Sequence, residues 1–280
     1  MAGVRDAARL PIAANRPVTD MPKIRRDDER SDTDFVESLD RGLRVVEVFG
    51  GAVRMMTLSD VAKAAHLPRA TARRILLTLE RRGYVASDGK MFSLTPRVLT
   101  LAGAYMTSSQ VVTILQPVLD EMSSKAQEIS SLALLDGHDV IFVARASPAR
   151  VFSAGIDLGY RLPAFCSSVG RAMLGQYSNG ELTALLDAMT LTPLTPLTVT
   201  NKKAVKAAII ADREKGYSLV DREAEPGFRS ISVPVRRYDD KIVAAINMGA
   251  HVDRVSTDEM IDRFLPLLRD AVATVKPLLL

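Results

Sequence analysis

Three arginines lie close together in one short segment of the chain, and their spacing suits contact with a polyanion. In the stretch LPRATARRILLTLERRG, Arg69, Arg73 and Arg74 accompany Ala70 and Thr71. In a helix these residues would lie on and around the exposed face of its N-terminal half. Arginine can make two hydrogen bonds to a guanine edge, while threonine can touch a thymine methyl or reach a phosphate. The alternative is an ordinary solvated helix face.

The residues around this segment predict the elements that would present it. Ser59 can cap a short first helix. Pro68 suits the first turn of a second helix, which runs to about Arg82 and is stopped by Gly83. A short hairpin follows in residues 84–94, with a Ser-Asp-Gly-Lys turn. Two short helices with a tight break, followed by a hairpin, are typical of a winged helix-turn-helix, whose second helix reads bases from its N-terminal end.

The positive charge of the chain is concentrated in the same region. The formal net charge is +4, and residues 35–98 hold 11 basic and 6 acidic side chains, a net +5. Residues 1–34 are neutral overall, with 7 of each sign, and residues 99–280 carry 19 basic and 20 acidic side chains. A local excess of this kind favours a nucleic-acid partner, because neutralising phosphates drives non-specific binding.

Cysteine, histidine and hydropathy exclude several other classes of protein. A single cysteine, Cys166, cannot form an internal disulfide, and His66, His138 and His251 are too far apart in sequence for a metal-binding motif. Cys166 could be a nucleophile at a helix start, but no partner histidine motif or phosphate-binding loop accompanies it, so a small buried side chain is the favoured interpretation. No apolar run is long enough to span a membrane and no signal peptide is recognisable. We expect a soluble, cytoplasmic protein that is not an enzyme and needs no metal or cofactor.

Four segments are predicted along the chain. Residues 1–34 are predicted to be a flexible tail, because they combine prolines with a mixed-charge run and lack an apolar period. Residues 35–95 hold the winged helix-turn-helix, and its first helix is predicted from the spacing of five apolar side chains: Phe35, Leu39, Leu43, Val46 and Phe49. Residues 96–107 form a linker helix, and residues 108–280 a second domain.

The second domain is predicted to be α+β with a largely antiparallel sheet, because hairpins occur with helices grouped between them. A long helix begins at Val111 and a final helix covers 256–276. The other predicted helices are 167–177, 180–189 and 201–215, and the predicted strands are 131–135, 140–144, 151–154, 217–221, 230–235 and 242–249.

The segment GYRLPAFCSSVGRAMLG is the most unusual stretch of this domain. Ser167 and Ser168 stand where the helical pattern starts, and a helix start offers free N–H groups that suit a carboxylate. The alternative is a plain helix cap with nothing bound.

Two further positions could contribute to a ligand site. Arg229, in the polar loop between two predicted strands, could pair with a ligand carboxylate, or with Glu223 or Glu225 of its own loop. Asn247 stands inside an apolar run and needs a partner, either protein or ligand.

These motifs, in this order, resemble the IclR-type bacterial transcriptional regulators over about residues 35–278. The resemblance rests on five segments: the helix-turn-helix, LTPRVLTLAGAYM, GYRLPAFCSSVGRAMLG, GYSLVDREAEPGFRSISVPV and AAINMGAH. The resemblance implies a winged helix-turn-helix, a linker helix and an effector-binding domain, assembled as a homodimer or a dimer of dimers on double-stranded operator DNA. The positions that the resemblance assigns to the effector pocket are Ser168, Val169, Asp221, Ser230, Asn247 and Gly249.

Within the family, the chain looks most like the subgroup that controls aromatic-acid breakdown, with protocatechuate, 4-hydroxybenzoate and β-ketoadipate pathway regulators. We therefore expect a regulator controlled by a small carboxylate of that kind. The alternatives are a regulator of the same family that senses glyoxylate, pyruvate or another small acid, and a ligand-binding or enzymatic domain with a vestigial DNA-binding module.

Overall fold

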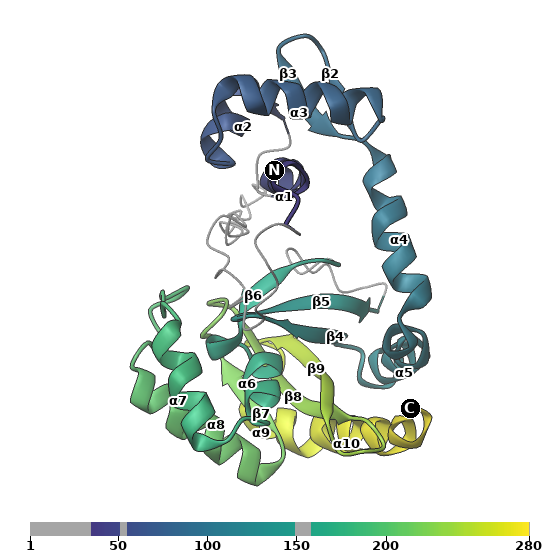
Figure 1. The fold of residues 1–280 in the computed structure, drawn as a ribbon. Helices are drawn as coiled ribbons and strands as arrows, with labels where there is room; N and C mark the ends of the chain where they lie inside the picture. Colours follow the sequence, from purple (N-terminus) through teal and green to yellow (C-terminus); the bar gives the residue numbers. More distant parts are fainter. Residues whose placement is uncertain (1–34, 51–54, 149–157, 280) are drawn as a thin grey trace, which may run out of the picture.

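The computed structural model describes residues 35–50, 55–148 and 158–279, which form a small and a larger unit with a helix between them (Figure 1). The tail predicted for residues 1–34 and the strand predicted at 151–154 lie outside the described residues. The connecting helix α4 (Leu99–Ser108) follows a 3₁₀ turn, Pro96–Val98, where the linker helix was predicted.

The small unit is a helix-turn-helix with a wing, as predicted. Its helices are α1 (Glu37–Glu47), α2 (Leu58–Ala64) and α3 (Arg69–Arg81), and its strands are β1 (Met56–Thr57), β2 (Val85–Ser87) and β3 (Met91–Leu94). β1 was not predicted, and it pairs antiparallel with β3 at the edge of the wing.

Two details of the small unit differ from the prediction. Thr57, not Ser59, caps α2, because the Thr57 hydroxyl accepts from the backbone N–H of Asp60 while the Asp60 carboxylate accepts from that of Thr57. The apolar stripe predicted for the first helix is also divided: Phe49 is buried in the 3₁₀ turn Val48–Gly50 that follows α1, whereas Leu39 and Leu43 of α1 are 61% and 52% exposed. The structure therefore leaves part of this stripe on the surface.

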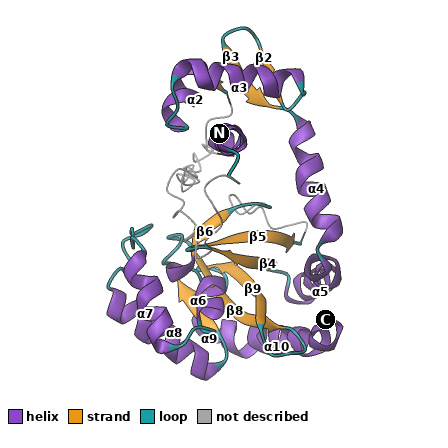
Figure 2. Cartoon of the chain, in the orientation of Figure 1, coloured by secondary structure: helices purple, strands orange, loops and turns teal. Residues whose placement is uncertain are grey.

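The larger unit is an α+β domain built on one fully antiparallel six-stranded sheet, in the order β6-β5-β4-β9-β8-β7 (Figure 2). Its strands are β4 (Ile129–Asp136), β5 (Asp139–Ala146), β6 (Arg161–Pro163), β7 (Ser218–Asp221), β8 (Phe228–Arg236) and β9 (Ile242–His251). Its helices are α5 (Gln110–Ala126), α6 (Ser168–Leu174), α7 (Asn179–Ala188), α8 (Lys202–Lys215), α9 (Thr257–Glu259) and α10 (Leu265–Val275).

Two features of this unit were not predicted. The short strand β6 runs directly into a 3₁₀ turn, Ala164–Cys166, and then into α6. The final helix is interrupted by a π-helical turn at Met260–Phe264, so it divides into α9 and α10.

The two faces of the sheet carry different cores. Leu132, Ile231 and Ile246 point to the face covered by α5 and α10. The other face is covered by α6, α7 and α8, and Ala133 and Ala245 point into that core. Because side chains alternate along a strand, every second residue of β4, β8 and β9 belongs to this α6 face.

Among the described residues no single helix is long and apolar enough to cross a bilayer. Helices 96–108 and 110–126 meet the criteria of length and composition only when taken together across a bend of 87°. No cluster of three or more potential metal ligands occurs in the described part of the chain.

Candidate nucleic-acid interface and ligand site

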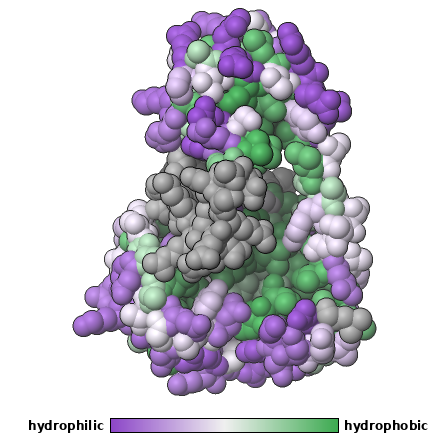
Figure 3. Space-filling view, viewed as in Figure 1, coloured by the Kyte–Doolittle hydropathy of each residue, from purple (hydrophilic) through white to green (hydrophobic). Residues whose placement is uncertain are grey.

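The N-terminal half of α3 presents an exposed basic face. Arg69, Ala70, Arg73 and Arg74 are exposed, and Thr71 is half-buried beside them. On the inner face of the same helix, Ala72 and Leu76 are completely buried against the small core. Within residues 35–50, 55–148 and 158–279 no ion pair or hydrogen bond engages the three guanidinium groups, so their donors are open to a partner. Figure 3 shows the hydrophilic character of the surface around α2 and α3.

At the start of α6, Ser167 caps the helix and Ser168 makes a hydrogen bond to the sheet. Ser167 is the N-cap, and its hydroxyl accepts from the backbone N–H of Gly170 at 3.2 Å. The hydroxyl of Ser168 lies 2.7 Å from that of Ser230 on β8. Val169 is buried in the core beneath α7 and α8. Ser168 is therefore the predicted site residue of α6 that reaches the sheet.

Gly170 allows this close packing. A Cβ at this position would lie 2.2 Å from the carbonyl oxygen of Ala164, in the turn before α6. The helix is consequently held against the turn that β6 leads into.

The central strands carry small and polar side chains on the α6 face. Ser131 of β4, Asn247 of β9 and Ser232 of β8 stand directly opposite one another in register, and Ser230 stands opposite Gly249. We call these five residues the polar floor. Ser131, Ser232 and Asn247 are all at least nine-tenths buried. The Ser232 hydroxyl and the Oδ1 atom of Asn247 have no hydrogen-bond partner among the described residues.

Two of the predicted site residues do not belong to the polar floor. Asp221 stands opposite Arg229, and Arg229 stands opposite Ala250, which points to the α10 side of the sheet. The Arg229 Nε donates to Asp221 at 3.0 Å and its Nη1 donates to the carbonyl of Val255 at 2.9 Å. Alternation along the strands therefore places Asp221 and Arg229 on the opposite face of the sheet from the polar floor. Val220 takes the place beside Ser230.

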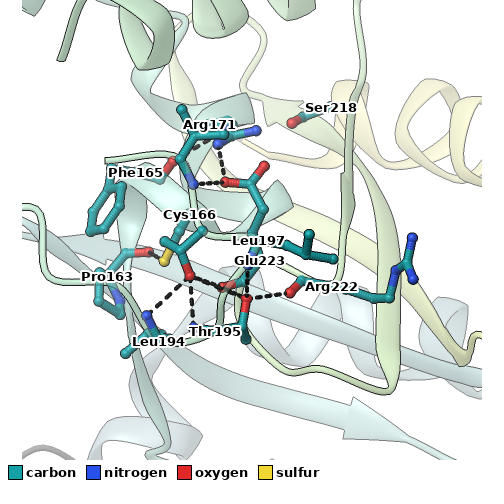
Figure 4. Close-up of polar contacts among 12 residues, drawn as sticks. Pro163, Phe165, Cys166, Arg171, Leu194, Thr195, Leu197, Ser218, Arg222 and Glu223 are labelled. Atoms are coloured by element: carbon teal, nitrogen blue, oxygen red, sulfur yellow. Dashed lines mark hydrogen bonds and ion pairs between the residues drawn. The ribbon is translucent and has the colours of Figure 1, made fainter. Parts of the chain in front are cut away.

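A buried ion pair behind α6 was missed by the sequence prediction (Figure 4). The Arg171 guanidinium donates to Glu223 at 2.7 Å and to the carbonyl of Phe165 at 2.8 Å. Glu223 also accepts from the backbone N–H of Val199, and the Thr198 hydroxyl donates to the Glu223 carbonyl. Glu223 thus pairs with Arg171 rather than with Arg229. An arginine inside the apolar stretch VGRAML could have indicated this pair, because a buried charge needs a partner.

Arg161 on β6 is paired with two acidic side chains of the hairpin formed by β4 and β5. Arg161 on β6 donates to Asp136 at 2.7 Å and to Asp139 at 3.2 Å. Burial raises the pKa of Glu47, on α1 of the small unit, and the nearby positive charge of Arg161 acts against that rise.

The groups that could perform covalent chemistry are poorly placed for it. Cys166 is completely buried, and its thiol donates to the carbonyl of Pro163 at 3.7 Å. His138 lies in the turn between β4 and β5, where burial lowers its pKa. Neither side chain faces the polar floor in a nucleophile–base pair.

A winged helix-turn-helix with an open arginine face, joined by a helix to a separate α+β domain, defines a DNA-binding regulator with a ligand-binding domain. The chain matches the family models of the "IclR helix-turn-helix domain" over residues 38–89 and "Bacterial transcriptional regulator IclR C-terminal" over residues 103–276. It belongs to the IclR family of transcriptional regulators.

Three similar proteins illustrate the relationship. The Pca regulon regulatory protein of Pseudomonas putida is 38% identical over 253 residues, 90% of this chain and 87% of the relative. The crystal structure of "a putative transcriptional regulator RHA06195 from Rhodococcus sp. RHA1" is 41% identical with a TM-score of 0.76, over 86% of this chain and 97% of the other. A double mutant of the PobR inducer-binding domain from Acinetobacter, solved with 3-hydroxybenzoic acid, is 30% identical with a TM-score of 0.57, over 60% of this chain and 98% of the other. The printed names of all three describe regulatory proteins or a domain of one.

Proposed function

We propose that this regulator binds an aromatic or related small acid on the α6 face of its sheet, and that the bound acid changes its affinity for operator DNA. The polar floor carries this proposal. The opposite face of the same strands is filled by large aliphatic side chains, whereas the floor is built from serines, a glycine and an asparagine with unpartnered atoms. A similar domain from Acinetobacter was solved with a hydroxybenzoic acid.

The paired hydroxyls of Ser168 and Ser230 are our proposed donors to the acid's carboxylate. They can give up their mutual hydrogen bond at little cost, since each would then donate to a charged oxygen. Backbone register also places Arg145 of β5 on this face, opposite Ser131, and its positive charge favours an anionic ligand. Asn247 lies in the sheet beneath the acid, and at Gly249 the missing side chain leaves room for the Phe228 ring, which would border the acid.

For operator binding we propose that α3 enters the major groove. Arg69, Thr71 and Arg73 would contact base edges or the groove wall, and Arg74 a phosphate. An effector shifts this binding only if it has different affinities for two states of the protein. β6, which holds Arg161, leads into α6, which holds Ser168, and the positive charge of Arg161 lowers the pKa of Glu47 on α1 against the effect of burial. This continuity supports a coupling between the two sites.

We propose that two copies assemble through α1 and α4. Leu39 and Leu43 of α1 are exposed, and α4 combines exposed Leu99, Leu101 and Tyr105 with no charged residue. Exposed apolar surface of this extent marks an interaction site. A twofold dimer also presents two copies of α3 to a palindromic operator. The proposed location of the regulator is the cytoplasm, where it would meet its operator.

A thermal-shift series on the full chain tests the effector assignment. Protocatechuate, 4-hydroxybenzoate, β-ketoadipate, glyoxylate and pyruvate are added to the wild type and to the variants Ser168→Ala and Ser230→Ala. A ligand that binds only the folded state raises the melting temperature with concentration. We expect an aromatic or pathway acid to do so, and both variants to weaken it.

The matched control is Ser130→Ala, which removes a buried serine hydroxyl that donates to the Leu119 carbonyl on the opposite face of the sheet. It is expected to lower the melting temperature of the free protein without changing the ligand-induced shift. A shift with glyoxylate or pyruvate alone would favour the other branch of the family.

A further inference from the structure

Two neighbouring side chains of the polar floor lack hydrogen-bond partners although they are deeply buried. Ser232 has no exposed surface and Asn247 only 6%, and they stand opposite each other on β8 and β9. Neither the Ser232 hydroxyl nor the Asn247 Oδ1 is bonded to any described residue. A buried polar atom without a partner is unfavourable, so an arrangement with two of them side by side points to a group that completes it.

Three other buried serines around the sheet have hydrogen-bond partners. Ser168 bonds to Ser230 on the same face, and Ser218 donates to Asp212 at 2.6 Å. On the opposite face, Ser130 donates to the Leu119 carbonyl at 2.7 Å. Within the described part of the chain, the completely buried side-chain polar atoms that lack a partner are the Ser232 hydroxyl and the Asn247 Oδ1, on adjacent strands.

A hydroxyl group is complementary to both atoms. It can donate its proton to the Asn247 Oδ1 and accept the proton of the Ser232 hydroxyl. A carboxylate has no proton to donate, and a methyl group or bare ring edge satisfies neither atom.

The position of the pair relative to Ser168 and Ser230 sets a distance. Ser232 lies two residues beyond Ser230 on the same strand and the same face, which is about 7 Å. A benzene ring with a carboxylate and a hydroxyl at opposite ends spans a similar length, whereas adjacent substituents do not.

We propose that Ser232 and Asn247 form a subsite that recognises a hydroxyl of the bound acid distal to its carboxylate. This rests on the proposed function, because it requires the acid to bind on the polar floor with its carboxylate at Ser168 and Ser230. The preferred ligand class is consequently a ring-hydroxylated aromatic acid with the hydroxyl across the ring from the carboxylate.

Isothermal titration of the full chain with 4-hydroxybenzoate, 2-hydroxybenzoate and benzoate tests the subsite. For the wild type we expect 4-hydroxybenzoate to bind at least about tenfold more tightly than either other acid, because a missing or misplaced hydroxyl leaves both atoms unpaired. In Ser232→Ala and Asn247→Leu, 4-hydroxybenzoate should bind no more than about threefold more tightly than the other two acids. The affinity of these variants for benzoate should equal or exceed that of the wild type. Ser130→Ala should keep the wild-type preference.

The stability of the ligand-free protein gives a second readout. Removing an unsatisfied hydroxyl leaves no lost partner, so Ser232→Ala should melt at or above the wild-type temperature. If Asn247→Leu does not fold, Asn247→Ser replaces it with a shorter polar side chain. Variants that bind acids but keep the wild-type preference would overturn the subsite and leave the proposed function standing. No binding of any acid by the wild type would overturn both.

Discussion

Ser168 on α6 and Ser230 on β8 share a hydrogen bond of 2.7 Å although 62 residues separate them in the chain. Ser168 is almost completely buried and directly follows the N-cap of α6. The bond therefore fixes the start of this helix to the sheet at the edge of the polar floor, where the effector's carboxylate is proposed to bind. A ligand that takes over these hydroxyls also loosens the helix from the strand.

A double-mutant cycle measures how strongly the two serines are coupled. Ser168→Ala and Ser230→Ala should each reduce the free energy of unfolding by about 1 kcal/mol, because each leaves the other hydroxyl without its partner. The double variant should cost little more than either single one, with a coupling of about 0.5–1.5 kcal/mol. Urea denaturation of the ligand-free chain gives these values. Strictly additive effects would show that the bond does not stabilise the fold.

Gly170 should be intolerant of any side chain. An alanine Cβ would meet the Ala164 carbonyl oxygen at 2.2 Å, and backbone must move to relieve that contact. We expect Gly170→Ala to lower the free energy of unfolding by about 1–3 kcal/mol and to weaken effector binding. At Gly180 of α7 a Cβ would have no neighbour within 4 Å, so Gly180→Ala should be neutral or stabilising by up to about 1 kcal/mol. Equal effects at both positions would contradict the close packing of α6.

Asp212 on α8 should make stability depend on pH. Desolvation by burial raises the pKa of its carboxyl, although the hydrogen bond from Ser218 and the positive charges of Arg171 and Lys215 oppose the rise. A raised pKa means that folding favours the protonated form, so this contribution is present below the unfolded pKa of 3.8 and is lost as the pH rises through the folded value. At neutral pH the ionised carboxylate is therefore destabilising.

Asp212→Asn should consequently be more stable than the wild type at pH 7, because the amide oxygen can still accept from Ser218. The advantage should shrink as the pH falls below the folded pKa of Asp212 toward 3.8. Melting temperatures of both proteins between about pH 4 and pH 7 test this, with Asp187→Asn at an exposed position as the control for lost charge. If the wild type instead melts at a higher temperature than Asp212→Asn at pH 7, and the difference disappears at acid pH, the pKa of Asp212 is lowered by folding rather than raised.

Local patterns predicted most of the elements, because apolar spacing and helix stops report directly on backbone structure. Gly83, for example, ends α3 with a φ of +77°, as its place after the apolar period predicted. Thr57 was missed as the α2 cap because Ser59 is also a good capping residue, and the decision depends on the reciprocal bond from Asp60. β6 is only three residues long, which is too short to show a periodicity.

The residues that share the polar floor could be predicted only in part, since the face of a strand residue depends on register. Asp221 and Val220 are adjacent in sequence, yet only Val220 lies on the face of Ser230. Ser232 could have been recognised from the alternation of polar residues in the segment SIS, which places it on the same face as Ser230. An arginine inside the apolar stretch VGRAML indicates that Arg171 needs a buried partner, but Glu223 lies 52 residues away and no local pattern identifies it as that partner.

The exposed arginines of α3 should differ in whether they contact bases or phosphates of the DNA. Arg69→Ala should cost about 1–3 kcal/mol on operator DNA and relax sequence preference if the guanidinium contacts a guanine. Arg74→Ala, at a proposed phosphate contact, should weaken binding to operator and random duplexes equally and reduce the salt dependence. Fluorescence anisotropy at several salt concentrations separates the two, with Arg263→Ala in the larger unit as a control. Equal losses on both duplexes for Arg69→Ala would make that residue a phosphate contact.

Replacing exposed leucines of α1 tests the proposed assembly. Leu39 and Leu43 are 61% and 52% exposed and lie one helical turn apart, so Leu39→Glu with Leu43→Glu places two charges on the proposed interface without disturbing a buried contact. We expect the sedimentation coefficient to fall from that of a dimer or larger assembly to that of a monomer. Operator affinity should fall by roughly 10²-fold or more, because each copy of α3 then binds its half-site alone. Leu197→Glu, at a leucine that is 50% exposed in the larger unit, should leave both quantities unchanged. A variant of α1 that sediments like the wild type would place the contact between copies elsewhere on the chain.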